Sequence, residues 1–267
     1  MNSWDKSDSY DVYKPEYMSK HAPFNYHIGP NDLKLMHDLR TSGSDHRKFM
    51  RMIIVYVDIT APLYWWKEFD TYKVGTVANS CSTMHKISDK EFTIDDFSHE
   101  HLLDDCGIYT DSKVGGKVFG ATQDFDTSSL GILKITVDAL NYYREAYLQC
   151  KKQLQAAKTP AERRTLVALQ KTYWWQMIQL LPSSYNQRRT IMLSYEVLTN
   201  IWESRKTHKL DEWCEHDNLD RNGFNIEKKY FGLCDWICGL PYSELITGEN
   251  DCYDARGTEA SSSSTEN

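Results

Sequence analysis

Long hydrophobic runs, a basic start and an excess of positive charge are all missing from this sequence. No window approaches the roughly 18 consecutive apolar residues that a membrane-spanning helix needs. The first residues, Met1 to Asp8, contain neither a basic start nor the apolar stretch of a secretion signal. The formal net charge is −7, so the whole molecule offers no attractive field to a nucleic acid polymer or an anionic membrane. We therefore expect a soluble cytoplasmic protein that binds neither.

The common catalytic and metal-binding motifs are missing too. No Gly-rich phosphate loop, Ser-His-Asp arrangement or metalloprotease motif occurs. The 7 cysteines are an odd number scattered along the chain, which favours reduced thiols and predicts no disulfide. Cys214, His216, Cys234 and Cys238 are of the types that hold zinc. Because Cys234 and Cys238 have the spacing of a helical pair in an amphipathic run, core packing is the favoured interpretation and no metal is expected.

Length and composition predict one large domain with less ordered ends. The chain has 267 residues, 40% of them apolar, which is enough to bury a substantial core. Residues 1–24 are polar and tyrosine-rich and are expected to form an arm, followed by a domain at 25–255. Within it, 86–129 is acidic and glycine-containing and is interpreted as a loop-rich insertion. The serine-rich segment 256–267 is predicted to be a disordered tail.

Apolar periodicity predicts several helices and one strand. Asn31 and Asp32 are good N-cap residues for the first helix. Thr159, Pro160 and Glu162 form a helix start signal with a capping box, so the two long helices on either side should form an antiparallel hairpin. The predicted helices are 31–41, 62–72, 130–157, 160–180 and 188–205, with a further helical run at 230–240; the predicted strand is 52–60, apolar enough to be covered on both faces.

Two tryptophan pairs lie on these predicted helices. They are Trp65-Trp66 and Trp174-Trp175. Neighbouring residues on a helix point in different directions. One member of each pair is therefore expected to face outward, and an oligomer interface is a natural place for it.

The most specific pattern lies between Ala61 and His85. Ala61-Pro62 ends the predicted strand, and Lys73, Asn79 and Ser82 follow the predicted helix. This frame resembles the signature of flavin-dependent thymidylate synthases, in which Arg-His-Arg is followed by seven residues and a Ser. In that family Asn-Glu lies inside the gap and Arg-Tyr follows the Ser.

Several charged positions of the signature differ here. Thr71 and Tyr72 stand in place of Arg and His, and Ser80 in place of the Glu. Met84-His85 replaces Arg-Tyr, and eight residues rather than seven separate Lys73 from Ser82. Each missing arginine removes a charge-assisted hydrogen bond worth roughly 1.5–3 kcal/mol to a nucleotide phosphate. The usual nucleotide is therefore not expected to bind in the usual way.

A second stretch of the same resemblance lies further along the chain. Leu181-Pro182 is followed by Asn200 and Arg205 at the family's spacing. Arg188 and Arg189, between them, are candidates for a replacement phosphate contact, although a solvated face is the favoured interpretation. Upstream, His46 lies in the short turn before the strand, where the family places a His that helps to form the flavin and folate site.

The resemblance implies a fold and a chemistry. The fold is α+β, like thymidylate synthase complementing proteins, with a twisted antiparallel sheet, long helices and a homotetrameric assembly. Reduced FAD supplies hydride, methylenetetrahydrofolate supplies the carbon and NADPH reduces the flavin, so that a deoxyuridylate-type pyrimidine nucleotide (dUMP) is methylated. By the same resemblance, the catalytic residues are Arg205 and Ser82 and the cofactor-binding residues are His46, Lys73, Thr76, Asn79 and Asn200.

The missing arginines leave two other interpretations open. One is a catalytically altered paralogue that binds flavin or a nucleotide, acts as a structural protein or modifies another pyrimidine nucleotide. The other is a purely structural oligomer without either ligand. In the family frame Arg205 polarises the pyrimidine carbonyl; outside it, Arg205 is a surface arginine favoured by a helix C-terminus.

Overall fold

The computed structural model describes residues 6–11, 26–80, 82–104, 128–214 and 232–248. The predicted tail, most of the predicted arm and the second part of the predicted insertion lie outside these ranges. The chain divides into two compact units, unit 1 (1–56, 72–77 and 192–267) and unit 2 (57–71 and 78–191). A three-stranded sheet has the order β3-β5-β4, and its strands are β3 (Ile54–Pro62), β4 (Val77–Ser80) and β5 (Asn186–Ser194).

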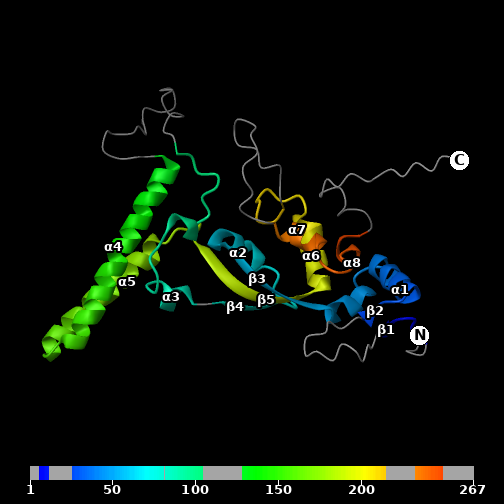
Figure 1. The fold of residues 1–267 in the computed structure, drawn as a ribbon, viewed down its shortest axis with the longest axis horizontal. Helices are drawn as coiled ribbons and strands as arrows, with labels where there is room; N and C mark the ends of the chain where they lie inside the picture. The colour runs from blue at the N-terminus through cyan, green and yellow to red at the C-terminus, as the bar shows by residue number, and fades with distance from the viewer. Residues whose placement is uncertain (1–5, 12–25, 81, 105–127, 215–231, 249–267) are drawn as a thin grey trace, which may run out of the picture. The chain divides into compact units, whose positions relative to one another are not determined.

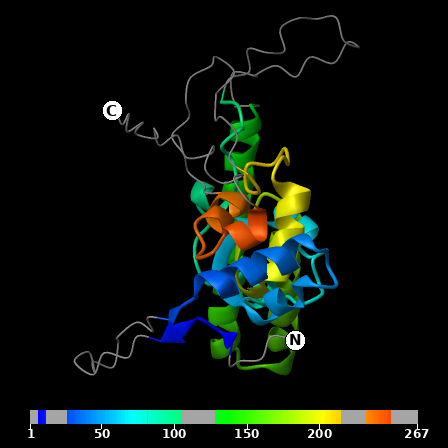
Figure 2. The ribbon, with the colours of Figure 1, turned by 90° about the vertical axis from the view of Figure 1, so that its right-hand side faces the viewer.

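Unit 1 is built around helix α6, which contacts α7, α8 and a short 3-10 helix, η3 (Figure 2). Leu198 and Ile201 of α6 are fully buried there, with Ile237 of α7 and Leu245 of α8. A two-residue antiparallel pair, β1 with β2, joins Tyr10 to His27. The elements of unit 1 are β1 (Tyr10–Asp11), β2 (Tyr26–His27), α1 (Pro30–Thr41), η3 (Arg47–Met52), α6 (Tyr195–Arg205), α7 (Leu233–Cys238) and α8 (Glu244–Thr247).

Helix α1 confirms the predicted helix at 31–41, but its cap differs from the expected one. The helix begins at Pro30 and its N-cap residue is Gly29. The Asp8 carboxylate accepts hydrogen bonds from the backbone N–H of Asn31 (2.9 Å) and Asp32 (3.0 Å). A side chain more than twenty positions away therefore satisfies the free donors at the start of α1.

Unit 2 is dominated by α4 and α5, which pack side by side as the predicted hairpin (Figure 1). Thr159 accepts a hydrogen bond from the Glu162 N–H at 3.2 Å, which confirms the predicted start of α5. The predicted helix before it is confirmed as α4. The elements are α2 (Leu63–Phe69), α3 (Thr83–Lys86), a 3-10 helix η4 (Ile94–Asp96), α4 (Ser129–Ala156) and α5 (Pro160–Leu180).

The core of unit 2 joins this hairpin to the chain before it. Leu140 of α4 and Met177 of α5 are fully buried. Ile87, Phe92 and Phe97 belong to the same cluster. The described part of the segment predicted as an insertion therefore contributes large side chains to the core.

Two predictions about the sheet are wrong. The strand predicted at 52–60 is β3, but it alternates between exposed and partly buried residues instead of being covered on both faces. Ile54 and Tyr56 are 41% and 71% exposed. The first half of the helix predicted at 188–205 is strand β5, and helix α6 begins only at Tyr195.

The tryptophan pairs behave differently from each other. Trp65 and Trp66 are both 1% exposed, so the prediction that one of them faces outward is wrong. Trp66 donates its indole N–H to the Gln187 carbonyl at 2.9 Å. Trp175 is exposed, as predicted for one member of the second pair.

The structure as described is a mixture of helices and small antiparallel sheet, consistent with the predicted α+β class. The described helices include none that is both long enough and apolar enough to cross a membrane.

Candidate functional site

Three segments of unit 1 meet here: helix α6, the turn at 72–76 and η3. The turn at 72–76 touches this helix at two points. Tyr72 accepts a hydrogen bond through its hydroxyl oxygen from Nε of Arg205, at 2.9 Å. A Cβ atom on Gly75, whose φ is +77°, would lie 3.3 Å from Cγ2 of Val197. The third segment, η3, packs against the same helix.

Arg205 is held between the turn and the chain that follows α6. Its guanidinium carbon lies 4.8 Å from the centre of the Trp213 ring and 5.7 Å from that of Tyr72. Both distances allow cation-π attraction, and the position in the last turn of the helix favours a positive charge. The arginine is thus presented as an oriented cation, half-buried among aromatic rings.

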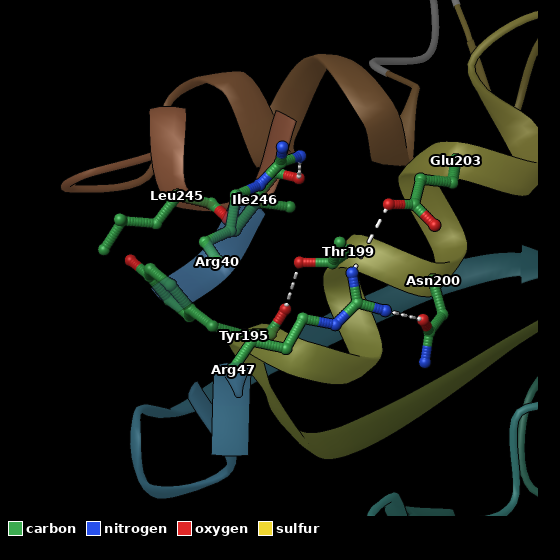
Figure 3. A network of polar contacts seen from close by, with 8 residues as sticks. All are labelled: Arg40, Arg47, Tyr195, Thr199, Asn200, Glu203, Leu245 and Ile246. Atoms are coloured by element: carbon green, nitrogen blue, oxygen red, sulfur yellow. Dashed lines mark hydrogen bonds and ion pairs between the residues drawn. The ribbon is translucent and has the colours of Figure 1, made fainter. Parts of the chain in front are cut away.

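Arg47 of η3 forms a second polar group on α6 (Figure 3). It donates to Oδ1 of Asn200 at 2.8 Å and lies 3.5 Å from Oε1 of Glu203. Its side chain is only 13% exposed, so this guanidinium is largely desolvated. Nearby, Arg40 donates to the carbonyl oxygens of Leu245 and Ile246 at the end of α8.

Three buried polar atoms of these segments have no hydrogen-bond partner within the described part of the chain. They are Oγ1 of Thr76, Nε of Arg47 and Nε1 of Trp202. Each comes from a different one of the three segments. Buried donors and acceptors in folded proteins are nearly always paired. The three atoms are therefore candidates for contact with a polar ligand.

Five of the seven predicted site residues belong to unit 1. Arg205 and Asn200 lie on α6, and Thr76 lies in the turn with its hydroxyl buried. His46, directly before η3, and Lys73 in the turn are exposed. Four of the five thus lie on α6 or in the 72–76 turn, and His46 directly precedes η3.

The other two predicted residues, Asn79 and Ser82, belong to unit 2. Asn79 lies in β4 and is exposed. Ser82 is the N-cap residue of α3, and its hydroxyl makes no capping hydrogen bond with the described residues. Their place relative to the unit 1 group stays a prediction.

Sequence reasoning missed the roles of Tyr72, Trp213 and Arg47. In the sequence Tyr72 is only the replacement for a family histidine, whereas in the structure its hydroxyl is the partner of Arg205. A signal for Arg47 existed, because it directly follows His46 and is a cation at the start of a helical turn. Trp213 offered no such signal, since its contact with Arg205 depends on the fold.

Arg188 and Arg189, the candidates for a replacement phosphate contact, are engaged within unit 2. Arg188 pairs with Asp58 at 2.5 Å. Arg189 pairs with Asp70 at 2.8 Å and lies over the ring of Trp66 at 4.2 Å. Hydrogen bonds from Thr190 and Arg188 also hold the pKa of the Asp58 carboxyl below its usual value. The two charges are therefore already balanced by carboxylates.

The cysteines correct one prediction. Cys238 is disulfide-bonded, whereas no disulfide was expected. The other described cysteines, Cys150, Cys214 and Cys234, are free, so its partner lies outside the described residues. Within the described ranges no group of three or more metal-ligating side chains occurs, and His216 of the zinc alternative falls outside them.

Comparisons with known proteins add a distant structural neighbour. No protein-family model and no curated protein matches the sequence. The chain is similar to the crystal structure of flavin-dependent thymidylate synthase ThyX from Helicobacter pylori, complexed with FAD and dUMP. The identity is 12%, the match covers 69% of this chain and 73% of that chain, and the TM-score is 0.38. Because a likeness at this level is too distant to assign an activity, the site is interpreted from its own residues.

Proposed function

We propose that this chain is a flavin-dependent thymidylate synthase-like protein that binds FAD and a pyrimidine nucleotide. The observation that carries the proposal is the set of three buried, unpartnered polar atoms on η3, the 72–76 turn and α6. An unpaired buried polar group costs about 1–3 kcal/mol. The polar heteroatoms of a flavin or pyrimidine ring are suitable partners, and the segments are those that carry the sequence resemblance.

The proposed roles follow the chemistry of the side chains. When bound, reduced FAD supplies hydride, while methylenetetrahydrofolate supplies the carbon and NADPH the electrons. Arg205 stabilises the negative charge that builds up on a pyrimidine carbonyl oxygen, and Ser82 addresses the same ring. Tyr72 and Trp213 hold the Arg205 guanidinium in place, which lowers the cost of orienting it. The residues that hold flavin are His46, Lys73, Thr76, Asn79 and Asn200, in a homotetrameric assembly.

A second candidate is a catalytically altered paralogue that keeps the scaffold but binds flavin or a nucleotide without this reaction, or modifies another pyrimidine nucleotide. The pairing of Arg188 with Asp58 and of Arg189 with Asp70 favours it. Because both arginines are already paired with carboxylates, a phosphate in place of those bound by the signature arginines would have to compete with Asp58 and Asp70.

The first test is the visible absorption of the purified protein, followed by acid release and identification of any chromophore. The proposal expects bound FAD, or binding of added FAD. Thr76→Val removes the buried hydroxyl at nearly constant volume and should weaken FAD binding by about tenfold, the equivalent of ~1.4 kcal/mol. Thr165→Val on α5 removes an exposed hydroxyl and should leave binding unchanged. A colourless protein that ignores added FAD contradicts the proposal.

The second test separates the synthase from the altered paralogue. A synthase consumes NADPH only when dUMP and methylenetetrahydrofolate are both present, and it rescues a thymidine-requiring host. Arg205→Ala should abolish this consumption. Arg51→Ala, which removes a partly exposed arginine paired with Glu196 at the opposite end of α6, should retain it. Flavin-loaded protein that fails in both assays favours the paralogue.

A further inference from the structure

Two free cysteines of unit 1 lie next to each other. Cys214 follows Trp213, and Cys234 lies in α7. The backbone N–H of Leu233 donates to the Glu212 carbonyl at 3.0 Å, and that of Cys234 to the Trp213 carbonyl at 2.7 Å. These two successive bonds join the chain at 212–214 to the start of α7 and bring the backbones of the two cysteines together. Close backbones are the first requirement of a disulfide, whose Cα atoms lie about 4.4–6.8 Å apart.

The nearness of the two thiols is reflected in their pKa values, through a hydrogen bond between the two side chains. This bond is the main cause that lowers the pKa of Cys214, and it is also the main cause, ahead of burial, that raises the pKa of Cys234. One sulfur is thus favoured as the thiolate, which is the nucleophilic form, while the other keeps its proton. This division of roles suits a pair in which one thiol attacks and the second resolves.

We propose that Cys214 and Cys234 form a redox-active dithiol that hydrogen peroxide oxidises to a disulfide. The Cys214 thiolate attacks one peroxide oxygen, the O–O bond breaks, and hydroxide leaves, giving a sulfenic acid on Cys214. The Cys234 sulfur then attacks the Cys214 sulfur, an S–S bond forms, and the sulfenic oxygen leaves as water with the proton of Cys234. Overall, two thiols and one peroxide become one disulfide and two waters. A peroxide is small enough to reach sulfurs whose residues are 6% and 1% exposed.

The dithiol is connected to Arg205. In its protonated form, Cys214 donates its S–H to the backbone carbonyl oxygen of Arg205 at 2.9 Å. Disulfide formation removes this donor and leaves the last turn of α6 without that hydrogen bond. The oxidation state of the pair therefore acts on the end of the helix that carries the Arg205 guanidinium, whatever ligand that residue contacts.

Cys150 provides a matched control, because it is free and 6% exposed, the same fraction as Cys214, but it lies on α4 in unit 2. The protein is reduced, desalted, treated with a graded series of hydrogen peroxide, alkylated and digested with trypsin without reductant. Cleavage places Cys214 in the peptide 210–221, Cys234 in 230–256 and Cys150 in 145–151. Mass spectrometry should find 210–221 joined to 230–256 at peroxide levels that leave most of Cys150 alkylated.

Three outcomes would overturn the proposal. The first is equal oxidation of Cys150 and Cys214 in the wild-type protein, which would mean that burial alone sets reactivity. The second is the absence of any link between the two peptides. The third is a link that persists in Cys234→Ser, since Cys214 would then pair with another cysteine of 230–256. The comparison with Cys150 needs no variant, so it holds even if a substitution prevents folding.

Discussion

At the residue scale, Tyr195 links burial to alkaline stability. It begins α6 with a side chain that is 5% exposed, and its hydroxyl donates to the Pro241 carbonyl. Burial, followed by the nearby charge of Glu244, raises the pKa of Tyr195 above its ordinary value. Because the folded pKa exceeds the unfolded one, the contribution of Tyr195 to stability is full below about pH 10 and is lost as the pH rises through the folded pKa.

In Tyr195→Phe, the free energy of unfolding should therefore fall less steeply above pH ~10. Near neutral pH the variant should be less stable by about 0.5–1.5 kcal/mol, because it lacks the hydrogen bond of the hydroxyl. The measurement is urea unfolding over a series of pH values. Tyr56→Phe, at an exposed tyrosine, is the control and should follow the wild-type curve. Some slope will remain, since burial also raises the pKa of Tyr185. If the free energy of unfolding depended on pH in the same way in Tyr195→Phe and in the wild type, Tyr195 would have the same pKa in the folded and unfolded states.

The candidate site could be predicted from the sequence only in part, because single residues were visible and their partners were not. Arg205 and Asn200 stood out through their spacing from Pro182. Tyr72 is 133 positions from Arg205, and no local pattern connects the two. The same holds for Arg47 and Asn200, which are 153 positions apart. A hydrogen bond of this kind depends on the packing of α6 and becomes visible only with the fold.

At the scale of elements, the start of α5 rests on one capping residue. Thr159 accepts from the Glu162 N–H, and Glu162 in turn accepts from the Lys158 N–H at 3.2 Å. Thr159→Ala should lower the free energy of unfolding by about 1 kcal/mol, because the first turn of α5 loses the acceptor for one of its free donors. Thr165→Ala, at an exposed position inside the same helix, should cost less than half as much. Thermal unfolding followed by circular dichroism measures both, and equal losses would show that the cap contributes nothing specific.

The elements that the sequence predicted well are those with local signals. Helices α4 and α5 have long apolar stripes, α5 also has a clear start signal, and the bounds of both lie within one residue of the expected ones. Strand β5 was missed because Ile191, Tyr195 and Leu198 also fit a helical spacing. Its true pattern has period two: Ile191 and Leu193 are fully buried, whereas Arg188 and Thr190 are exposed. Where a strand runs directly into a helix, the sequence contains a period of two followed by a period of about 3.6. The helical period of α6 also fits Ile191, so it predicts a helix that begins too early.

At the scale of the whole molecule, the residues that the structure describes bury apolar side chains in each of two compact units. Unit 2 buries Leu140 and Met177 with the aromatic residues before α4. Unit 1 buries Leu198 and Ile201 with residues of α7 and α8. The division was not visible in the sequence, because unit 1 is assembled from three separate stretches of chain and unit 2 from two. Composition fixes how much apolar surface can be buried, and it carries no information about which stretches share a core.

Separate cores predict separate effects of core substitutions. Leu140→Ala removes a fully buried side chain from unit 2 and should lower stability by about 2–5 kcal/mol, through reduced burial and the cavity left behind. Ile201→Ala makes a comparable cavity in unit 1. Hydrogen exchange followed by mass spectrometry should show faster exchange mainly in peptides of α4 and α5 for Leu140→Ala, and mainly in those of α6 for Ile201→Ala, because exchange reports the stability of each cooperative region. If each variant instead accelerated exchange equally in all three helices, the two cores would open as one cooperative body, and a ligand bound at Arg205 would then stabilise α4 and α5 as much as α6.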